Sequence, residues 1–316
     1  MSAPILIAGP TASGKSALAV TVARQLRGVI VNADSQQVYA EWRVLTARPS
    51  AADEATAPHR LYGHVGVAEA YSVGRWLDEV RGVLAAPGGG LETRPDGTSE
   101  SGPRPIVVGG TGLYFRALTQ GLSPIPEVSA EVRAAGEAAL ERIGLTRFAE
   151  ELARRDPETA EGLDLANPRR VLRAWEVLEA TGTGLAEWKA RTPPPLIPLE
   201  RAVAVALVPP RDRLYARCDA RLDAMIAQGA LDEVTRVMAL GVPRSAPAMK
   251  AVGAAELASH LAGELTLDEA AARAKTETRR YAKRQLTWIR NQMAAWRQMD
   301  PTAPGLADHV LALARA

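Results

Sequence analysis

Cysteine is nearly absent from this sequence of 316 residues, in which Cys218 stands alone. A single thiol excludes a disulfide framework and a cysteine-rich zinc site. Long apolar runs are missing as well, since none approaches the roughly 20 residues that a membrane-spanning helix needs. The apolar stretch at 4–8 is too short to be a secretory signal peptide. We therefore expect a soluble cytoplasmic protein that has no membrane partner. Separately, we expect it to act as a monomer.

A large excess of one charge is also missing. Lys and Arg number 38 and Asp and Glu number 36, which gives a formal net charge of +2. Any signal for nucleic-acid binding must therefore be local. The apolar content of 47% is enough for a sizeable core, and the length predicts one large domain or two modest ones.

Near the start, one glycine-rich segment matches the pattern G-x-x-x-x-G-K-[ST] at every fixed position. It consists of Gly9, Pro10, Thr11, Ala12, Ser13, Gly14, Lys15 and Ser16. A β-like run at 4–8 precedes it and a helix-like run at 17–24 follows it, which is the context of a P-loop. Such a loop holds phosphate oxygens with its backbone N–H groups and its lysine, while the Ser16 hydroxyl would ligate Mg²⁺. The complete motif disfavours an unliganded turn and predicts a site for a di- or triphosphate.

A second buried strand is predicted at 29–33, and Asp34 follows it directly. In a doubly wound sheet, ligands bind at the carboxyl ends of the strands, so Asp34 would face the P-loop crevice. An aspartate at this place can equally cap a turn or a helix. The residue alone does not decide between a capping role and a role in the crevice. Farther on, 62–67 is predicted to be a third strand and 72–84 a helix that begins at a serine cap.

The segment 86–105 contains several Pro and Gly clusters and no face that could be buried, so we predict a mobile surface insertion. A buried strand at 106–108 then runs into a second glycine-rich turn, 109–114. This turn would bring Thr111 to the same crevice. On its own, the Gly-Gly-Thr-Gly pattern is a weak signal, because it can be merely a tight turn.

Signals for strands disappear between 123 and 195, where amphipathic helices are predicted at 129–143, 146–153 and 168–180. A strand at 202–207 then returns to the sheet. The predicted fold is α/β: a P-loop NTPase-like core with a parallel sheet flanked by helices, plus an inserted all-helical domain. Its parts are 1–122 for the first section of the core, 123–195 for the insertion and 196–316 for the completion of the core.

Two predicted helices are rich in basic residues. In the helix that opens near 211, Arg213, Arg217 and Arg221 share one face, although a solvated stripe is the more common explanation. The last long helix, predicted at 270–298, carries many Arg and Lys against one acid, with Tyr281, Trp288 and Trp296 between them. This mixture suits a phosphate backbone and bases. It is equally typical of a helix with buried aromatics and solvated arginines.

Several stretches together, in this order along nearly the whole chain, resemble one family, the P-loop tRNA dimethylallyltransferases, also called tRNA isopentenyltransferases. Besides the P-loop they are Asp34-Ser35-Gln36-Gln37-Val38-Tyr39, Thr46-Ala47-Arg48-Pro49, Pro58-His59-Arg60-Leu61, Gly109-Gly110-Thr111-Gly112-Leu113-Tyr114, Asn167-Pro168-Arg169-Arg170, Lys250-Ala251-Val252-Gly253 and Lys283-Arg284-Gln285-Leu286-Thr287-Trp288. The chain departs from the family pattern at Ala40, Val44-Leu45 and Ala254.

The resemblance implies transfer of a dimethylallyl group from dimethylallyl diphosphate to N6 of the adenosine immediately 3′ of the anticodon in tRNA. It makes Asp34 the general base and Thr111 a residue that positions the reacting groups. Lys15, Arg221 and Arg217 would grip the diphosphate beside Mg²⁺, and the inserted domain would clamp the anticodon arm. The implied tRNA contacts are Asp34, Ser35, Gln36, Gln37, Thr111, Arg133, Arg169, Arg170, Arg173, Lys250, Gly253, Arg280 and Arg284.

Three other functions share parts of this pattern. A small-molecule kinase would use the P-loop for ATP and would need no basic aromatic helix. A prenyltransferase for free adenine nucleotides would lack a large RNA-clamping insertion. A non-catalytic RNA-binding NTPase switch would leave Asp34 and Thr111 without chemical roles.

Overall fold

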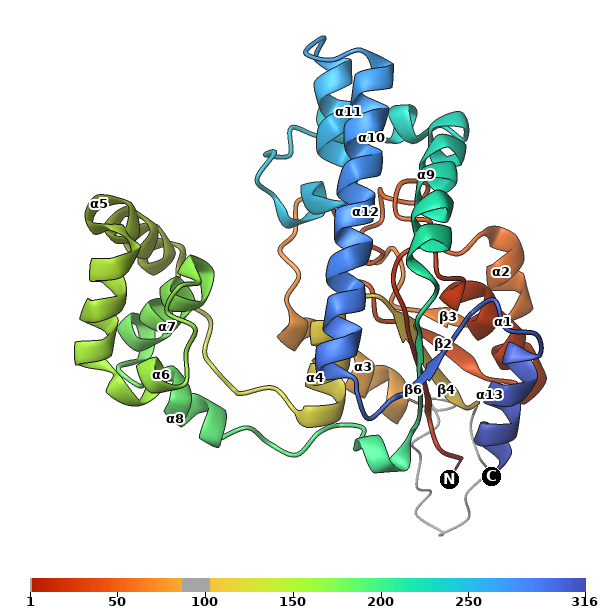
Figure 1. Ribbon diagram of the computed structural model, residues 1–316, viewed down its shortest axis with the longest axis horizontal. Coiled ribbons are helices and arrows are strands. Elements are labelled where there is room, and N and C mark those ends of the chain that lie inside the picture. The colour runs from red at the N-terminus through yellow and green to blue at the C-terminus, as the bar shows by residue number, and fades with distance from the viewer. Residues whose placement is uncertain (1, 87–102) are drawn as a thin grey trace. The chain divides into compact units, whose positions relative to one another are not determined.

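The computed structural model describes residues 2–86 and 103–316 and divides them into two compact units (Figure 1). The first unit holds the chain up to Thr119 and from Leu196 onward, and the second unit is Gln120–Pro195. The second unit thus begins three residues before the boundary expected from the sequence. Most of the segment 86–105, which we expected to be a mobile insertion, lies outside the described residues.

The first unit is built on a six-stranded parallel sheet with the order β3-β2-β4-β1-β5-β6. Its strands are β1 (Ile5–Ala8), β2 (Val29–Asn32), β3 (His59–Arg60), β4 (Pro105–Gly109), β5 (Val203–Leu207) and β6 (Arg297–Met299). Strand β1 pairs on both sides, with Leu6 opposite Val107 and Ala204. Buried strands of this kind read as continuous apolar runs, which is why β1, β2, β4 and β5 were found from the sequence.

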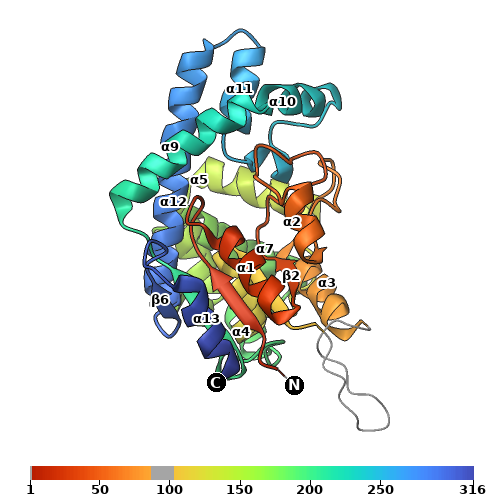
Figure 2. The ribbon, with the colours of Figure 1, turned by 90° about the vertical axis from the view of Figure 1, so that its right-hand side faces the viewer.

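Helices α1 (Lys15–Leu26) and α13 (Leu306–Arg315) pack side by side against the sheet (Figure 2). Leu18, Val22 and Val310 share one apolar core with sheet residues that include Ile7. Helix α2 (Ala51–Thr56) follows β2. Helices α3 (Val73–Ala85) and α4 (Gly112–Gln120) contact each other through a stacked ring pair, Trp76 and Tyr114, with centroids 4.3 Å apart.

Four further helices of this unit gather beside the loop that follows β2 (Figure 1). They are α9 (Arg211–Ala227), α10 (Ala230–Ala239), α11 (Ala254–Leu261) and α12 (Leu267–Gln292), and short 3₁₀ turns lie at Leu199–Arg201 and Pro247–Lys250. Helix α12 runs along both α9 and α11. The buried ring of Trp42, from the loop after β2, belongs to the same apolar core as Val237 and Leu257. These helices therefore hold this loop through the shared apolar core.

The second unit contains α5 (Ala130–Arg155), α6 (Pro157–Glu161), α7 (Pro168–Thr181) and α8 (Leu185–Ala190). Its own apolar core centres on Phe148, Leu152, Val171 and Trp175. Helix α5 consists of two helical parts that meet at a kink, where Gly144 (φ 74°, ψ 161°) leaves the helical backbone conformation. These two parts correspond to the two helices expected from the sequence. Within the described ranges, no helix is both long and apolar enough to cross a membrane.

The strand expected at 62–67 is wrong. The third strand is the short β3, and the chain turns immediately after it, since Leu61 (φ 62°) and Gly63 (φ 55°) take left-handed backbone conformations. An extended strand cannot pass through two such residues. Val65 keeps only a single bridge, to Tyr39.

The helix expected at 270–298 is also wrong at its C-terminal end. Helix α12 ends at Gln292, and Met293 (φ −125°, ψ 34°) leaves the helical region. The ring of Trp296 then packs edge-on against Phe115 at 5.2 Å, and Arg297 begins β6 beside β5. Pairing with the sheet edge and burial of an indole therefore override the helical pattern of the sequence.

Candidate active site

A cavity of about 510 Å³ lies where β1 and β2 end. The P-loop forms one wall, the segment after β2 and the loop 45–47 form another, and α9 and α12 close it. Its lining consists of Thr11, Ala12, Ser13, Gly14, Lys15, Ser16, Ala17, Asp34, Gln36, Gln37, Leu45, Thr46, Ala47, Arg217, Cys218, Ala220, Arg221, Leu222, Met225, Val252, Thr278 and Tyr281. All of these residues belong to the first unit.

The P-loop backbone has the shape that binds an anion. Ala12 (φ 59°) and Gly14 (φ 91°) take left-handed conformations on either side of Ser13. Alternation of this kind turns backbone N–H groups toward one concave side. Gly14 is also the N-cap of α1 and makes no side-chain cap bond, so the first N–H groups of that helix remain available for a ligand.

Lys15 is buried at the base of this loop, where its Nζ donates to the carbonyl of Pro10 at 3.3 Å. Burial is the main cause that lowers the pKa of Lys15 to about 8; the Asp34 carboxylate opposes this shift and the Arg221 charge contributes to it. The charged ammonium is thus poorly compensated by the protein alone. A bound diphosphate would supply the missing negative charge.

Arg221 on α9 braces the P-loop against the loop after β2. Its guanidinium donates to the Thr11 hydroxyl at 3.2 Å and to the Thr46 carbonyl at 3.4 Å. Burial lowers the pKa of Arg221. Of the three arginines expected on one face of this helix, Arg221 and Arg217 line the cavity, whereas Arg213 is exposed and does not.

Asp34 lines the cavity opposite the P-loop, and its carboxylate also caps a turn. The Oδ1 atom accepts the backbone N–H of Gln36 at 3.0 Å, and the Asp34 N–H donates to Asn32 at 2.8 Å. The capping role and the place in the cavity thus occur together in one residue. The role as general base remains a prediction.

Thr111 and Ser35 lie beside this turn without lining the cavity. The Thr111 hydroxyl accepts the backbone N–H of Ser35 at 3.0 Å and donates to the Ser35 hydroxyl at 3.3 Å. Gln36 does line the cavity, and its buried Oε1 has no hydrogen-bond partner among the residues that the structure describes. Gln37 lines the cavity as well, and its amide donates to the Thr46 carbonyl at 2.8 Å.

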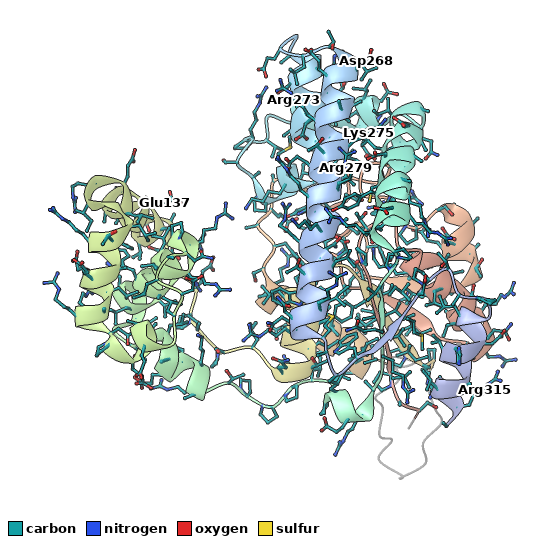
Figure 3. The ribbon with its side chains drawn as sticks, viewed as in Figure 1. Glu137, Asp268, Arg273, Lys275, Arg279 and Arg315 are labelled. Carbon is teal, nitrogen blue, oxygen red and sulfur yellow. The ribbon has the colours of Figure 1, made fainter. Side chains whose placement is uncertain are left out.

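The basic residues of α12 divide into two groups. Lys275 and Arg279 pair with Asp223 and Asp219 of α9, both at 2.7 Å, on the side of α12 that faces that helix (Figure 3). Arg280 and Arg284 are exposed, although Arg280 pairs with Glu277 of the same helix. Only part of the basic excess is therefore directed to solvent.

The other expected tRNA contacts lie outside the cavity. Lys250 is exposed, while Gly253 (φ 95°) is a buried N-cap of α11. In the second unit, Arg169, Arg170 and Arg173 are exposed on α7. Arg133 donates to the Val128 carbonyl at 2.7 Å.

Ser16 is the residue that the sequence offers for Mg²⁺. It is exposed at the start of α1 and lines the cavity next to Lys15. The described part of the chain has no cluster of three or more His, Cys, Asp or Glu side chains that could hold a metal. Mg²⁺ needs no such cage, because it is commonly held by one or two protein oxygens, water and substrate phosphates. The residues present therefore fit this ion.

Some residues of the site received no role from the sequence. Thr46 and Gln285 stood within recognisable motifs, but neither was assigned a contact. Tyr281 was noted only as one of the aromatics of α12, yet it lines the cavity, and burial together with the Asp34 charge raises its pKa. No local pattern identifies Leu222 and Met225 as cavity residues, because they line the cavity only through the tertiary packing of α9.

Fold and cavity together define a P-loop α/β protein in which the P-loop and the carboxylate of Asp34 line one cavity. The family model described as IPP transferase matches residues 37–292, and the one described as isopentenyl transferase matches 3–66. The chain therefore belongs to the IPP transferase family.

Three similar proteins illustrate this membership. The chain is 54% identical over 296 residues to the tRNA dimethylallyltransferase of Cereibacter sphaeroides, covering 94% of this chain and 88% of that one. It is 54% identical over 304 residues to the enzyme of the same name from Dinoroseobacter shibae, covering 96% of both chains. The crystal structure of the tRNA isopentenylpyrophosphate transferase of Bacillus halodurans is similar with a TM-score of 0.68 and 30% identity, covering 100% of this chain and 95% of that one.

Proposed function

We propose that this protein transfers the dimethylallyl group of dimethylallyl diphosphate to N6 of the adenosine immediately 3′ of the anticodon in tRNA. The products are N6-(dimethylallyl)adenosine and diphosphate. One observation carries the proposal: Asp34 lines the same cavity as Lys15 and Arg221, so a proton acceptor faces a diphosphate site. The names of the similar proteins support it.

The donor diphosphate would lie on the P-loop. As the bond between C1 and the diphosphate oxygen breaks, C1 gains cationic character and the leaving oxygens gain negative charge. Backbone N–H groups, Lys15 and Arg221 stabilise this charge in fixed positions. Mg²⁺, held by Ser16, would neutralise the diphosphate further.

An apolar wall next to the P-loop suits the hydrocarbon part of the donor. Leu45, Leu222, Met225 and Val252 line the cavity together with the phosphate-binding residues. A branched chain of five carbons buries its surface favourably against such side chains. This pairing of a charged and an apolar wall favours a prenyl diphosphate over ATP, the substrate of a kinase.

The acceptor adenine would enter from the side of Asp34. The exocyclic N6 amine attacks C1, the new C–N bond forms, and the Asp34 carboxylate takes the proton that the amine loses. Gln36 lines the same cavity, and its side-chain amide would hydrogen-bond to a base edge there. The base cannot react while stacked in the RNA, so it must be flipped out of its stack.

The exposed arginines of α7 and α12 would bind the RNA backbone around this adenosine. Single-stranded loop nucleotides are the readable part of RNA, which agrees with an anticodon loop as substrate.

Labelled dimethylallyl diphosphate, incubated with the protein and unmodified tRNA, tests the proposal. Nucleoside analysis should find the label on N6 of the adenosine next to the anticodon. Transfer to AMP in place of tRNA would favour the prenyltransferase of free nucleotides. Tighter binding of ATP than of the prenyl donor, with hydrolysis, would favour a kinase or a switch.

A further inference from the structure

Gln285, a buried residue of α12, connects two glycine-rich turns that lie far apart in the sequence. Its Oε1 accepts the backbone N–H of Thr11 in the P-loop at 2.8 Å. Its Nε2 donates to the backbone carbonyl of Gly110 at 2.9 Å. Because one partner is a donor and the other an acceptor, the two contacts fix the orientation of the amide. A single side chain thus sets the separation of the two turns.

The two turns serve opposite halves of the proposed reaction. Thr11 lines the cavity and receives a hydrogen bond from Arg221, so it belongs to the donor side. Gly110 precedes Thr111, whose hydroxyl is bonded to Ser35, directly after Asp34, so it belongs to the acceptor side. Gln285 itself does not line the cavity. It is placed to align the two sides without touching either substrate.

The second glycine-rich turn packs tightly against α12 around Gln285. A Cβ atom added at Gly110 would lie 2.2 Å from the Gln285 amide nitrogen, and one added at Gly112 would lie 2.1 Å from Nε1 of Trp288. The second turn is therefore seated directly against α12. The side chains of the small hollow beside Gln285, among them Phe115, Trp288 and Ile289, are uncharged. On the P-loop side, charged Arg221 reaches Thr11 from α9.

We propose that Gln285 is a positioning residue that aligns the bound donor diphosphate with the Asp34 and Thr111 side of the site. The inference rests on the proposed dimethylallyl transfer. A displacement of about 1 Å between reacting groups can cost roughly 10²-fold in rate. Loss of the bridge should therefore lower the rate of transfer far more than the affinity for donor or tRNA.

Two near-isosteric variants separate alignment from simple packing. Gln285→Met keeps the length of the side chain but makes neither bond, and its single-turnover rate should fall roughly 10²-fold at every pH. Gln285→Glu keeps the acceptor for Thr11 but sets a charged oxygen against the Gly110 carbonyl. Burial among uncharged groups raises the pKa of a carboxyl group, and the protonated form can donate to Gly110 again. The rate of this variant relative to wild type should therefore recover as the pH is lowered from about 9 to about 6.

The exposed Gln292, on the same helix, provides the matched control. Gln292→Glu should follow the wild-type rate across the pH range. Donor and tRNA dissociation constants and the melting temperature are measured for each variant. The inference is overturned if Gln285→Glu shows a pH-independent ratio, or if the loss in Gln285→Met appears as weaker donor binding at an unchanged rate.

The wild-type protein separates this inference from the proposed function. A wild type that transfers nothing overturns both. An active wild type with a normal rate in Gln285→Met overturns the inference alone. If Gln285→Met does not fold, the pH profile of Gln285→Glu decides.

Discussion

The buried carboxylate of Glu233 on α10 accepts the backbone N–H of Leu45 at 2.8 Å. Its other oxygen accepts the N–H groups of Arg43 and Val44, at 2.7 and 2.9 Å. Arg43, Val44 and Leu45 directly precede Thr46, whose carbonyl accepts a hydrogen bond from the Arg221 guanidinium. A carboxylate that does not line the cavity thus holds the loop that is hydrogen-bonded to Arg221, a cavity residue.

Glu233→Ala should be strongly destabilising. It leaves backbone donors in a buried place without an acceptor, and each unmet donor costs about 1–3 kcal/mol. We expect the free energy of unfolding in urea to fall by about 3 kcal/mol or more. The neighbouring Asp232 is exposed, so Asp232→Ala should cost less than about 1 kcal/mol. Equal effects of the two substitutions would contradict the role of Glu233.

Lys15 should make donor binding dependent on pH. Its pKa in the free protein is lowered to about 8 by burial, so its charged fraction falls as the pH rises through that value. Affinity for dimethylallyl diphosphate should therefore weaken above this pH, and binding near it should take up protons. Calorimetry in two buffers of different ionisation enthalpy measures that uptake.

Lys15→Ala should abolish transfer, because in the proposed reaction this lysine supplies the fixed charge on the leaving diphosphate. It should also remove the proton uptake on donor binding. The same substitution at exposed Lys189 on α8 should change neither quantity. Proton uptake that persists in Lys15→Ala would assign it to another group.

Asp34→Asn should lower the single-turnover rate by roughly 10²-fold or more, as expected when a positioned general base is lost. The amide still accepts the Gln36 N–H, so the turn should be kept and the donor affinity should hardly change. Asp164 provides the matched control, because its Oδ1 accepts the Ala166 N–H at 3.2 Å in the same local geometry. Asp164→Asn should leave the single-turnover rate unchanged. A near-normal rate in Asp34→Asn would leave Asp34 only its role in the turn.

Charge reversal at Arg169 and Arg170, or at Arg280 and Arg284, should weaken tRNA binding and flatten its dependence on salt. Each lost phosphate contact should reduce the slope of log affinity against log salt by roughly one. Donor affinity should stay unchanged. Arg81 and Arg315 are exposed elsewhere on the first unit, and their reversal is the control. Figure 3 shows Arg315 on α13. A parallel loss of donor and tRNA affinity would indicate damage to the fold instead.

The elements that could be read from the sequence are those whose signals are local. The buried strands β1, β2 and β4 are short apolar runs, and the P-loop carries its fixed residues within eight positions. The serine cap of α3 is likewise local, since Ser72 accepts the N–H of Arg75. Strand β6 was not predicted from the sequence, because its residues are largely exposed and form a strand only by pairing with β5.

The sequence by itself determined the P-loop, the buried strands β1, β2, β4 and β5, and the family, because glycine positions and apolar runs are encoded within a few residues. Only the tertiary structure decided which side chains meet. Thr11 and Gly110 come together through Gln285, which lies 274 and 175 residues away from them. Arg221 reaches the cavity and Arg213 does not, although both lie on one helix. Such contacts depend on how α9 and α12 pack over the ends of the strands, and no pattern local to the chain records that packing.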